Sequence, residues 1–201
     1  MIEVLLMKKI LYVVTSNNVK GATGIPTGFW LSELTHPLEK FAATGISYDI
    51  ASIKGGNPPI DGDSLDFNDA VNKKFWDDVD FQAKLADSAA IQKITRKIYE
   101  RGGIVSAVCH GPAALVNVKL SDEKYLVDGK TLTSFTNGEE AAVQATDIVP
   151  FLLETELKAH GANHIAAANW SDHVEVDGRL VTGQNPASAA SVGNAVVKFL
   201  S

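Results

Sequence analysis

The chain has a single cysteine, no long apolar run and no signal-peptide pattern. One cysteine in 201 residues excludes an internal disulfide framework and fits a reducing compartment, so we expect a cytoplasmic protein. No stretch has the length of a transmembrane helix. The apolar stretch 2–7 is too short for a signal-peptide core, and no basic region precedes it.

Positive charge is also scarce. The formal net charge is −6 and there is no long basic run, which argues against nucleic acid and anionic membranes as partners. A hydrophobic fraction of 45% and a charged fraction of 21% are typical of globular domains. Without repeats or low-complexity linkers, residues 1–201 are predicted to form one domain. Met7 is an alternative start, which would make residues 1–6 an N-terminal extension.

The one cysteine lies in the segment around which the chain is organised. Residues 104–108 are apolar and rich in β-branched side chains, which predicts a buried parallel strand, and Pro112 suits the first turn of a helix. Cys109 thus lies on a strand-to-helix turn, the layout of a nucleophile elbow, and Gly111 lets the turn close. Backbone N–H groups and the helix dipole are expected to favour the thiolate, with His110 as a proton carrier. A lone cysteine is otherwise most often core filler.

Strands and helices are predicted to alternate over most of the chain. Strands are expected at 10–15, 46–53, 104–108, 130–135 and 163–167, and as a hairpin at 174–182. Helices are expected at 29–44, 70–77, 81–86, 88–101 and 149–160, after Asn137 and after Pro186. Between Ile53 and Ile104, however, no convincing strand is found, although a doubly wound fold requires alternation.

Four segments resemble the ThiJ/PfpI superfamily of DJ-1-like proteins. They are residues 28–37 (GFWLSELTHP), 107–115 (AVCHGPAAL), 133–140 (TSFTNGEE) and 179–188 (RLVTGQNPAS). They follow the order of the family and are most similar to its branch of heat-shock chaperones and glutathione-independent glyoxalases, called glyoxalase III. The resemblance implies an α/β, flavodoxin-like three-layer sandwich with a mostly parallel sheet. It also implies a homodimer and no metal or organic cofactor.

The resemblance implies roles for individual residues. Cys109 is the nucleophile and His110 its partner. Glu33 is the acid that hydrogen-bonds near the thiol and shuttles protons, although the sequence pattern alone favours a solvated carboxylate near a helix N-terminus. Glu140 completes the Cys-His-Glu arrangement, with Glu139 as the alternative. The implied substrate-binding residues are Gly111, Asn185 and Pro186.

This chemistry suits a small 2-oxoaldehyde such as methylglyoxal. The thiolate adds to the aldehyde to form a hemithioacetal, and a carboxylate of raised pKa moves a proton between the two carbons. Hydrolysis of the resulting thioester releases a 2-hydroxy acid. The developing oxyanion needs backbone donors, and the N–H of His110 is one candidate.

The chain departs from the family near residues 86–88. Family members carry there a strand that lies beside the elbow strand, and its Gly-Gly turn supplies a second oxyanion N–H. We therefore expect the sheet to lack one central strand. Three explanations are open. The first, which we favour, is that the printed sequence omits a segment. The second is a natural or engineered deletion in which another strand fills the gap, and the third is a truncated, inactive product. If the deletion is real, we expect glyoxalase activity to be lost.

Two other functions compete with the glyoxalase. A stress chaperone would hold unfolded client proteins, and a redox sensor would use Cys109 as an oxidation site. A Cys109→Ala substitution separates these, because turnover would vanish whereas holdase activity would persist. Amidase or peptidase chemistry is a third option, since the same elbow serves acyl transfer.

Overall fold

The structure is a computed structural model that describes residues 8–54, 58–78 and 91–200. The helix predicted at 81–86, the junction predicted near 86–88 and the extension at 1–6 lie outside these residues. Within the described ranges, no helix is long and apolar enough to cross a membrane.

The first half of the described chain is a strand–helix–strand unit. Strand β1 (Lys9–Val14) pairs in parallel with β2 (Ser47–Ser52), and helix α1 (Leu31–Ala43) connects them. The apolar stripe of α1 is buried because its members recur at helical spacing. These residues are Leu31, Leu34, Leu38 and Phe41. The short helix α2 (Ala70–Trp76) then packs on α1, with Asp69 capping its first turn.

The second half contains the elbow strand. Strand β3 (Val105–Val108) pairs in parallel with β7 (Leu180–Gly183), which forms an antiparallel hairpin with β6 (Val174–Asp177). The hairpin turns at Gly178, whose φ of 58° suits glycine. The other elements of this half are α4 (Ile91–Glu100), β4 (Thr131–Leu132), α5 (Asn137–Ala142), α6 (Leu153–Ala159), β5 (Asn163–His164) and α7 (Ala189–Leu200).

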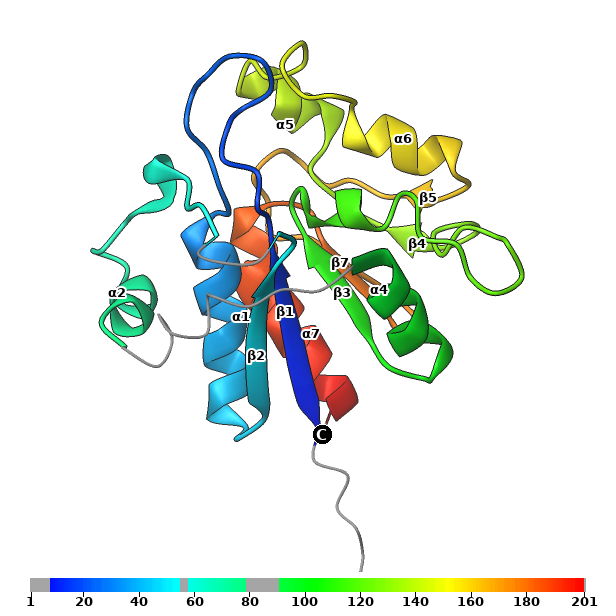
Figure 1. The fold of residues 1–201 in the computed structure, drawn as a ribbon, viewed down its shortest axis with the longest axis horizontal. Helices are drawn as coiled ribbons and strands as arrows, with labels where there is room; N and C mark the ends of the chain where they lie inside the picture. Colours follow the sequence, from blue (N-terminus) through cyan, green and yellow to red (C-terminus); the bar gives the residue numbers. More distant parts are fainter. Residues whose placement is uncertain (1–7, 55–57, 79–90, 201) are drawn as a thin grey trace, which may run out of the picture.

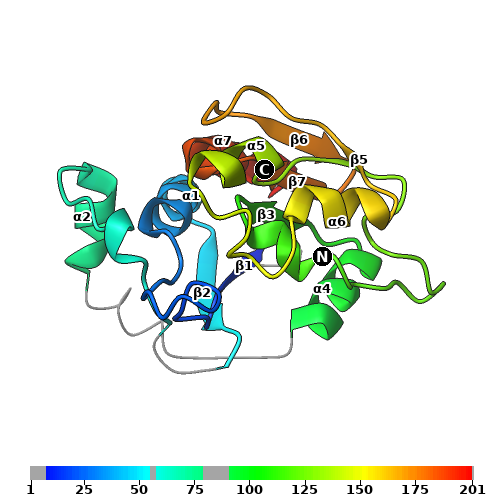
Figure 2. The same ribbon diagram turned by 90° about the horizontal axis from the view of Figure 1, so that it is seen from above.

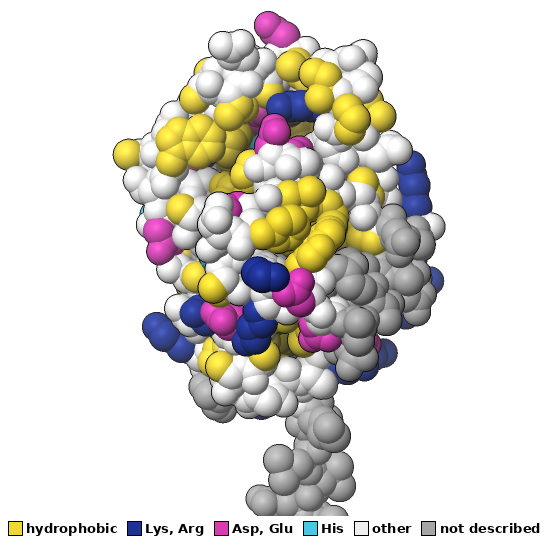
Figure 3. Space-filling view, turned by 90° about the vertical axis from the view of Figure 1, so that its left-hand side faces the viewer, with side chains coloured by type: hydrophobic (Ala, Val, Ile, Leu, Met, Phe, Trp, Pro, Cys, Tyr) yellow, Lys and Arg dark blue, Asp and Glu magenta, His cyan; other side chains and the backbone are white. Residues whose placement is uncertain are grey.

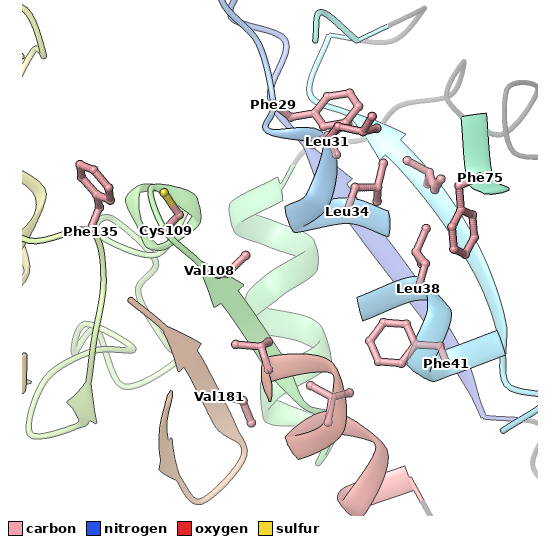
Figure 4. Packing of buried hydrophobic residues seen from close by; sticks show 14 residues of the cluster. Phe29, Leu31, Leu34, Leu38, Phe41, Phe75, Val108, Cys109, Phe135 and Val181 are labelled. Carbon is pink, nitrogen blue, oxygen red and sulfur yellow. The ribbon is translucent and has the colours of Figure 1, made fainter. Parts of the chain in front are cut away.

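The strands lie between two helical layers. Helices α1 and α7 pack together on one face, and α4 lies on the other (Figures 1 and 2). One buried cluster joins both sheet fragments to α1 and α7 (Figure 4), and a second joins β3 and β7 to α6 and the 115–127 segment. This is the expected flavodoxin-like α/β sandwich with mostly parallel strands.

The two halves do not form one continuous sheet. Among the described strands, β1 is hydrogen-bonded only to β2, and β3 only to β7. Yet β1 and β3 point the same way and occupy neighbouring places in both ribbon views (Figures 1 and 2). Leu11 and Val13 of β1 remain 40% and 36% exposed, although strands in such folds are normally covered on both faces. Among the described residues, no strand therefore pairs with both β1 and β3 at this place.

Several predicted elements are shorter than expected. The helix expected after Cys109 is a single 3-10 helix, Gly111–Ala114, closed by a bond from Ala113 N–H to the His110 carbonyl. The strand expected at 130–135 ends at Leu132, because the N–H of Thr133 bonds to the side chain of Thr182 instead of a backbone carbonyl. The helix expected at 149–160 begins only at Leu153.

The face that carries α1 and α2 bears no large field of one charge. Figure 3 shows acidic, basic and apolar side chains interspersed over it. A hollow of about 420 Å³ lies between α2 and the start of α1. Trp30 lines this hollow and is 37% exposed, so the structure places it at the helix entrance and not in the core.

Candidate active site

Cys109 occupies a strained backbone position at the end of β3. Its φ is +58°, a region that residues with a Cβ rarely adopt. The strain is held on both sides, because Cys109 N–H donates to the Gly183 carbonyl (2.9 Å) and the Cys109 carbonyl accepts from Phe135 N–H (2.9 Å). Figure 4 shows the sulfur just beyond Val108, close to Phe135. Such strain is typical of nucleophile elbows and other functional turns.

His110 connects the thiol to a buried carboxylate. Its Nδ1 lies 3.4 Å from Cys109 Sγ, and its Nε2 lies 2.8 Å from Glu140 Oε2. The Glu140 side chain is almost fully buried, whereas that of His110 is half exposed. If the carboxylate accepts the Nε2 proton, Nδ1 is left as an acceptor for the thiol proton. The structure therefore brings these three residues into one hydrogen-bonded chain.

Glu33 connects the two sheet fragments. Its backbone carbonyl accepts a hydrogen bond from the Tyr12 hydroxyl on β1, and its carboxyl group is hydrogen-bonded to Cys109, after β3. Burial raises the pKa of Glu33 to about 8, and the bond to Cys109 opposes this only in part. Glu33 is therefore mostly protonated near neutral pH. Its Oε1 is buried and has no hydrogen-bond partner among the described residues.

The thiol of Cys109 does not have the environment expected from the sequence. Burial raises its pKa well above the ordinary value, and the nearby Glu33 raises it further, through its charge when ionised and through its hydrogen bond. The backbone N–H of His110 lowers it by a smaller amount. The 3-10 helix that follows is also too short for a substantial dipole. The resting thiol is thus protonated, and the expectation of a stabilised thiolate was wrong.

Glu139, the alternative third acid, has a different set of contacts. Its Oε2 accepts from the N–H and hydroxyl of Thr136, forming a capping box. Its Oε1 accepts three hydrogen bonds, from Trp170 N, Gln184 Nε2 and Asn185 Nδ2. Burial alone would raise the pKa of Glu139, but these hydrogen bonds lower it. Glu139 is therefore an ionised anchor for α5, and Glu140 is the carboxylate that meets His110.

The three implied substrate-binding residues lie in different surroundings. Gly111 follows His110 directly, and a Cβ there would meet Ala107 Cβ at 3.4 Å, an ordinary contact. Asn185 is fully buried, and its amide donates to Glu139 and to the Ser171 carbonyl. Pro186 lines the hollow beside Trp30. Contacts between substrate and these residues remain predictions.

Sequence reasoning did not single out the aromatic residues beside His110. The ring of Phe135 stacks on His110 with centroids 4.4 Å apart, and Trp170 meets Phe135 at 5.7 Å. Trp170 is 48% exposed and has a φ of +65°, so it packs on Phe135 from the surface of the molecule. No sequence signal marks these contacts, because they join distant loops. In the described ranges, no three His, Cys, Asp or Glu side chains are grouped to hold a metal.

The comparisons with known proteins agree with this geometry. The family model described as DJ-1/PfpI family matches residues 23–199. The chain belongs to the DJ-1/PfpI family. Among curated members, Glyoxalase 3 of Candida albicans is 30% identical, with 95% of this chain and 98% of the relative covered. Glutathione-independent glyoxalase HSP31 of Saccharomyces cerevisiae is 32% identical, with 92% and 94% covered.

Solved structures of two proteins superpose on most of the chain. The Rapid Encystment Protein of Francisella tularensis has a TM-score of 0.91 at 35% identity, with 97% of this chain and 100% of that chain covered. Glyoxalase III of Candida albicans has a TM-score of 0.85 at 30% identity, with 96% and 97% covered. The alignment with Candida Glyoxalase 3 runs over 233 residues, more than the 201 of this chain. It therefore includes positions at which this chain has no residue.

Proposed function

We propose that this chain is a cofactor-independent cysteine enzyme that converts 2-oxoaldehydes such as methylglyoxal to 2-hydroxy acids. The observation that carries the proposal is the chain Cys109–His110–Glu140 together with the protonated Glu33, which is hydrogen-bonded to Cys109. Relatives named as glutathione-independent glyoxalases support the same reaction.

The contacts suggest how the first step proceeds. Because the resting thiol is protonated, its proton passes to Nδ1 of His110 as the sulfur adds to the aldehyde carbon. Glu140 stabilises the imidazolium that forms. The imidazolium then gives this proton to the aldehyde oxygen, and the product is a hemithioacetal, in which the former aldehyde carbon carries one hydroxyl, one hydrogen and the sulfur.

Glu33 then serves the proton transfer between carbons. A pKa of about 8 means that both protonation states are accessible near neutral pH. The carboxylate form accepts the proton from the carbon bound to sulfur, and the acid form returns a proton to the neighbouring carbon, while the hydroxyl proton of the first carbon passes to the former ketone oxygen. The resulting thioester is cleaved by water, which releases the 2-hydroxy acid and restores the thiol of Cys109.

The described site has one backbone N–H donor in place to stabilise the oxyanion, where two are expected. The N–H of His110 is available beside the sulfur, and the strand expected to carry a second donor is missing from the described sheet. Loss of one such donor typically reduces turnover about 10²- to 10³-fold. The loss of activity expected from the sequence is therefore revised to a reduction: we expect the 201-residue chain to turn over methylglyoxal at least about 100-fold more slowly than Candida Glyoxalase 3.

Two measurements on the purified chain test the proposal, once intact mass has established that it is 21.4 kDa. Methylglyoxal should protect Cys109 from alkylation by iodoacetamide, because hemithioacetal formation does not require the second donor. Lactate formation should be slow and should disappear in Cys109→Ala. Absence of both protection and lactate would contradict the proposal.

The finer expectations are tested separately. A homodimer is expected from the resemblance, and sedimentation of the purified chain measures it. Unfolded client proteins are the alternative partners, and suppression of aggregation by Cys109→Ala would favour the chaperone. A cytoplasmic location is tested by fractionation.

A further inference from the structure

An aromatic ring covers one face of the His110 imidazole. The ring of Phe135 lies against it, with centroids 4.4 Å apart and planes at 33°. Phe135 is buried, with 4% of its surface exposed, whereas the side chain of His110 is half exposed. The hydrogen bonds to the thiol and to the carboxylate use the two nitrogens at the edge of the imidazole. They leave the stacked face without an assigned role.

The position of Phe135 is fixed from two sides. Its backbone N–H donates to the carbonyl of Cys109 (2.9 Å), so the ring is tied to the elbow itself. The indole of Trp170 meets the ring at 5.7 Å with planes at 60°, an edge-to-face contact. Trp170 is held in turn, because its N–H donates to Glu139 Oε1 (2.8 Å). A ring that is anchored in this way can restrict the imidazole stacked on it.

The contact limits rotation of the imidazole about χ2. This torsion of histidine has broad energy wells, so the rotamer alone does not fix the plane of the ring. Yet Nδ1 must stay near the sulfur of Cys109, at 3.4 Å, while Nε2 stays 2.8 Å from Glu140 Oε2. A stacked ring of fixed position disfavours planes that break these contacts. Phe135 therefore helps to keep both nitrogens on their partners.

The contact also distinguishes the two charge states of the imidazole. The face of an aromatic ring carries the negative part of its quadrupole and attracts a cation that lies within about 6 Å of the centroid. The separation of 4.4 Å between Phe135 and His110 is inside this range. When the thiol proton passes to Nδ1, the imidazole becomes an imidazolium with one face already covered by the ring. The ring therefore stabilises the state that proton transfer creates.

We propose that Phe135 is a positioning residue for His110: it keeps the imidazole aligned with the thiol and the carboxylate, and it stabilises the imidazolium form. This inference rests on the proposed function, because the imidazolium forms as sulfur adds to the aldehyde. In that step the S–H bond breaks, the S–C bond forms, and the π electrons of the C=O bond move to oxygen. The oxygen then takes the proton from Nδ1.

Alkylation of Cys109 by iodoacetamide tests the inference, because it needs the thiolate–imidazolium pair but no aldehyde. Replacement of Phe135 by pentafluorophenylalanine nearly keeps the size of the ring and reverses the charge on its face, so folding should be preserved. At pH 7, alkylation of the intact 201-residue chain should slow about 5-fold or more. The pH–rate profile should move to higher pH, because the thiolate loses part of its stabilisation.

Other titratable groups act on the same pair of side chains. Glu33 on α1 and Glu139 on α5 raise the pKa of Cys109 through their charges, and Glu140 faces the imidazole. The replacement at Phe135 leaves all three carboxyl groups in the chain. The difference between the two pH–rate profiles therefore reports the effect of the aromatic ring.

A matched pair of variants separates reactivity from packing. Phe135→Leu keeps an apolar side chain but removes the ring, and it should slow alkylation as the fluorinated ring does. Phe41→Leu makes the same change in the same buried cluster, at a place well away from Cys109 (Figure 4). Its Tm should fall by a similar amount, whereas its alkylation should keep the parent rate.

Two outcomes overturn the inference. One is alkylation at the parent rate with the fluorinated ring, and the other is equal slowing in Phe41→Leu and Phe135→Leu. The proposed function is judged separately, by lactate formation. Slow alkylation of the Phe135 variants, in a protein whose parent forms no lactate, would support the inference and count against the proposed function. Unchanged alkylation, in a protein whose parent forms lactate, would do the reverse.

Discussion

At the scale of single residues, Glu33 makes stability depend on pH. Its folded pKa of about 8 lies above the ordinary value of 4.5. Between these values the unfolded chain releases a proton that the folded chain keeps, so stability is full below about pH 4.5 and declines as pH rises toward 8. Glu33→Gln should remove this decline, and by pH 7 it should stabilise the protein by on the order of 3 kcal/mol.

Chemical denaturation of Glu33→Gln and the parent at several pH values between 5 and 8 measures this effect. The difference in unfolding free energy should grow with pH. Glu123→Gln, which changes an exposed carboxylate, is the control and should show a constant difference. Parallel curves for Glu33→Gln and the parent would refute a raised pKa.

Substitutions of the adjacent acids Glu139 and Glu140 should have different effects. Loss of Glu139 should lower stability, and loss of Glu140 should lower the reactivity of Cys109. Glu139→Gln replaces a carboxylate, which accepts hydrogen bonds from three donors, by an amide whose N–H₂ group is itself a donor. Because a buried charged network is broken, the free energy of unfolding should fall by about 2–3 kcal/mol. The lowered pKa of Glu139 means that its contribution is present above pH 4.5 and is lost as pH falls through the folded value. Glu140→Gln should instead slow the protection of Cys109 by methylglyoxal, with a smaller change in Tm.

Thermal unfolding and iodoacetamide competition on the same two variants check this prediction. Glu139→Asp, which keeps the charge but shortens the side chain, should recover part of the lost stability. Equal losses of Tm in Glu139→Gln and Glu140→Gln would show that both acids are structural.

The sequence could indicate which residues carry the chemistry, but not how their surroundings shift their pKa values. The positions of Cys109, His110 and Glu140 followed from an elbow and a motif. The burial that raises the pKa of Cys109 depends on α1 and on Phe135, which are distant in sequence. The role of Glu139 had a local signal, since Thr136-x-x-Glu139 is a capping box.

At the scale of elements, Gly28 fixes the entrance of α1 and thereby the place of Glu33. A Cβ at Gly28 would lie 2.1 Å from the carbonyl oxygen of Pro59, which belongs to the backbone and has little room to move. The neighbouring Phe29 N–H also donates to that oxygen. Gly28→Ala should therefore lower the unfolding free energy by about 2 kcal/mol or more.

The control for this substitution lies nearby. At Gly62 a Cβ would meet nothing within 4 Å and φ is not positive, so Gly62→Ala should change stability by less than about 0.5 kcal/mol. Urea denaturation of both variants measures the contrast. Similar effects at the two glycines would mean that Gly28 is not a close backbone approach.

Elements with strong periodic patterns were predicted well, and those set by tertiary contacts were not. Helix α1 and strands β1, β2 and β3 agree with their patterns within about two residues. Strand β4 ends early because Thr182 captures the N–H of Thr133. The helix after Cys109 stays a 3-10 helix, although Pro112 in the sequence suggests an ordinary first turn.

At the scale of the whole molecule, the sequence already showed the break in alternation that the described elements have. In the part of the chain between β2 and β3 that the structure describes, helices follow one another, and a parallel sheet cannot continue without a strand between its crossovers. The sequence could not show that a carboxyl oxygen of Glu33 is buried without a hydrogen-bond partner, because the place of Glu33 depends on contacts to both β1 and the end of β3.

The divided sheet makes a prediction about amide protection along β3. The N–H groups of Val105 and Cys109 are bonded on the β7 side, and the register of the ladder places Ala107 on that side too. Ser106 and Val108 face the opposite side of β3, where no described residue is paired with the strand, so their amides should exchange at least about 10-fold faster than those of their neighbours. Hydrogen exchange followed by NMR on the unliganded chain resolves these residues. An alternating pattern means that the edge is open, whereas uniform protection along β3 means that a strand already pairs there and the sheet is complete.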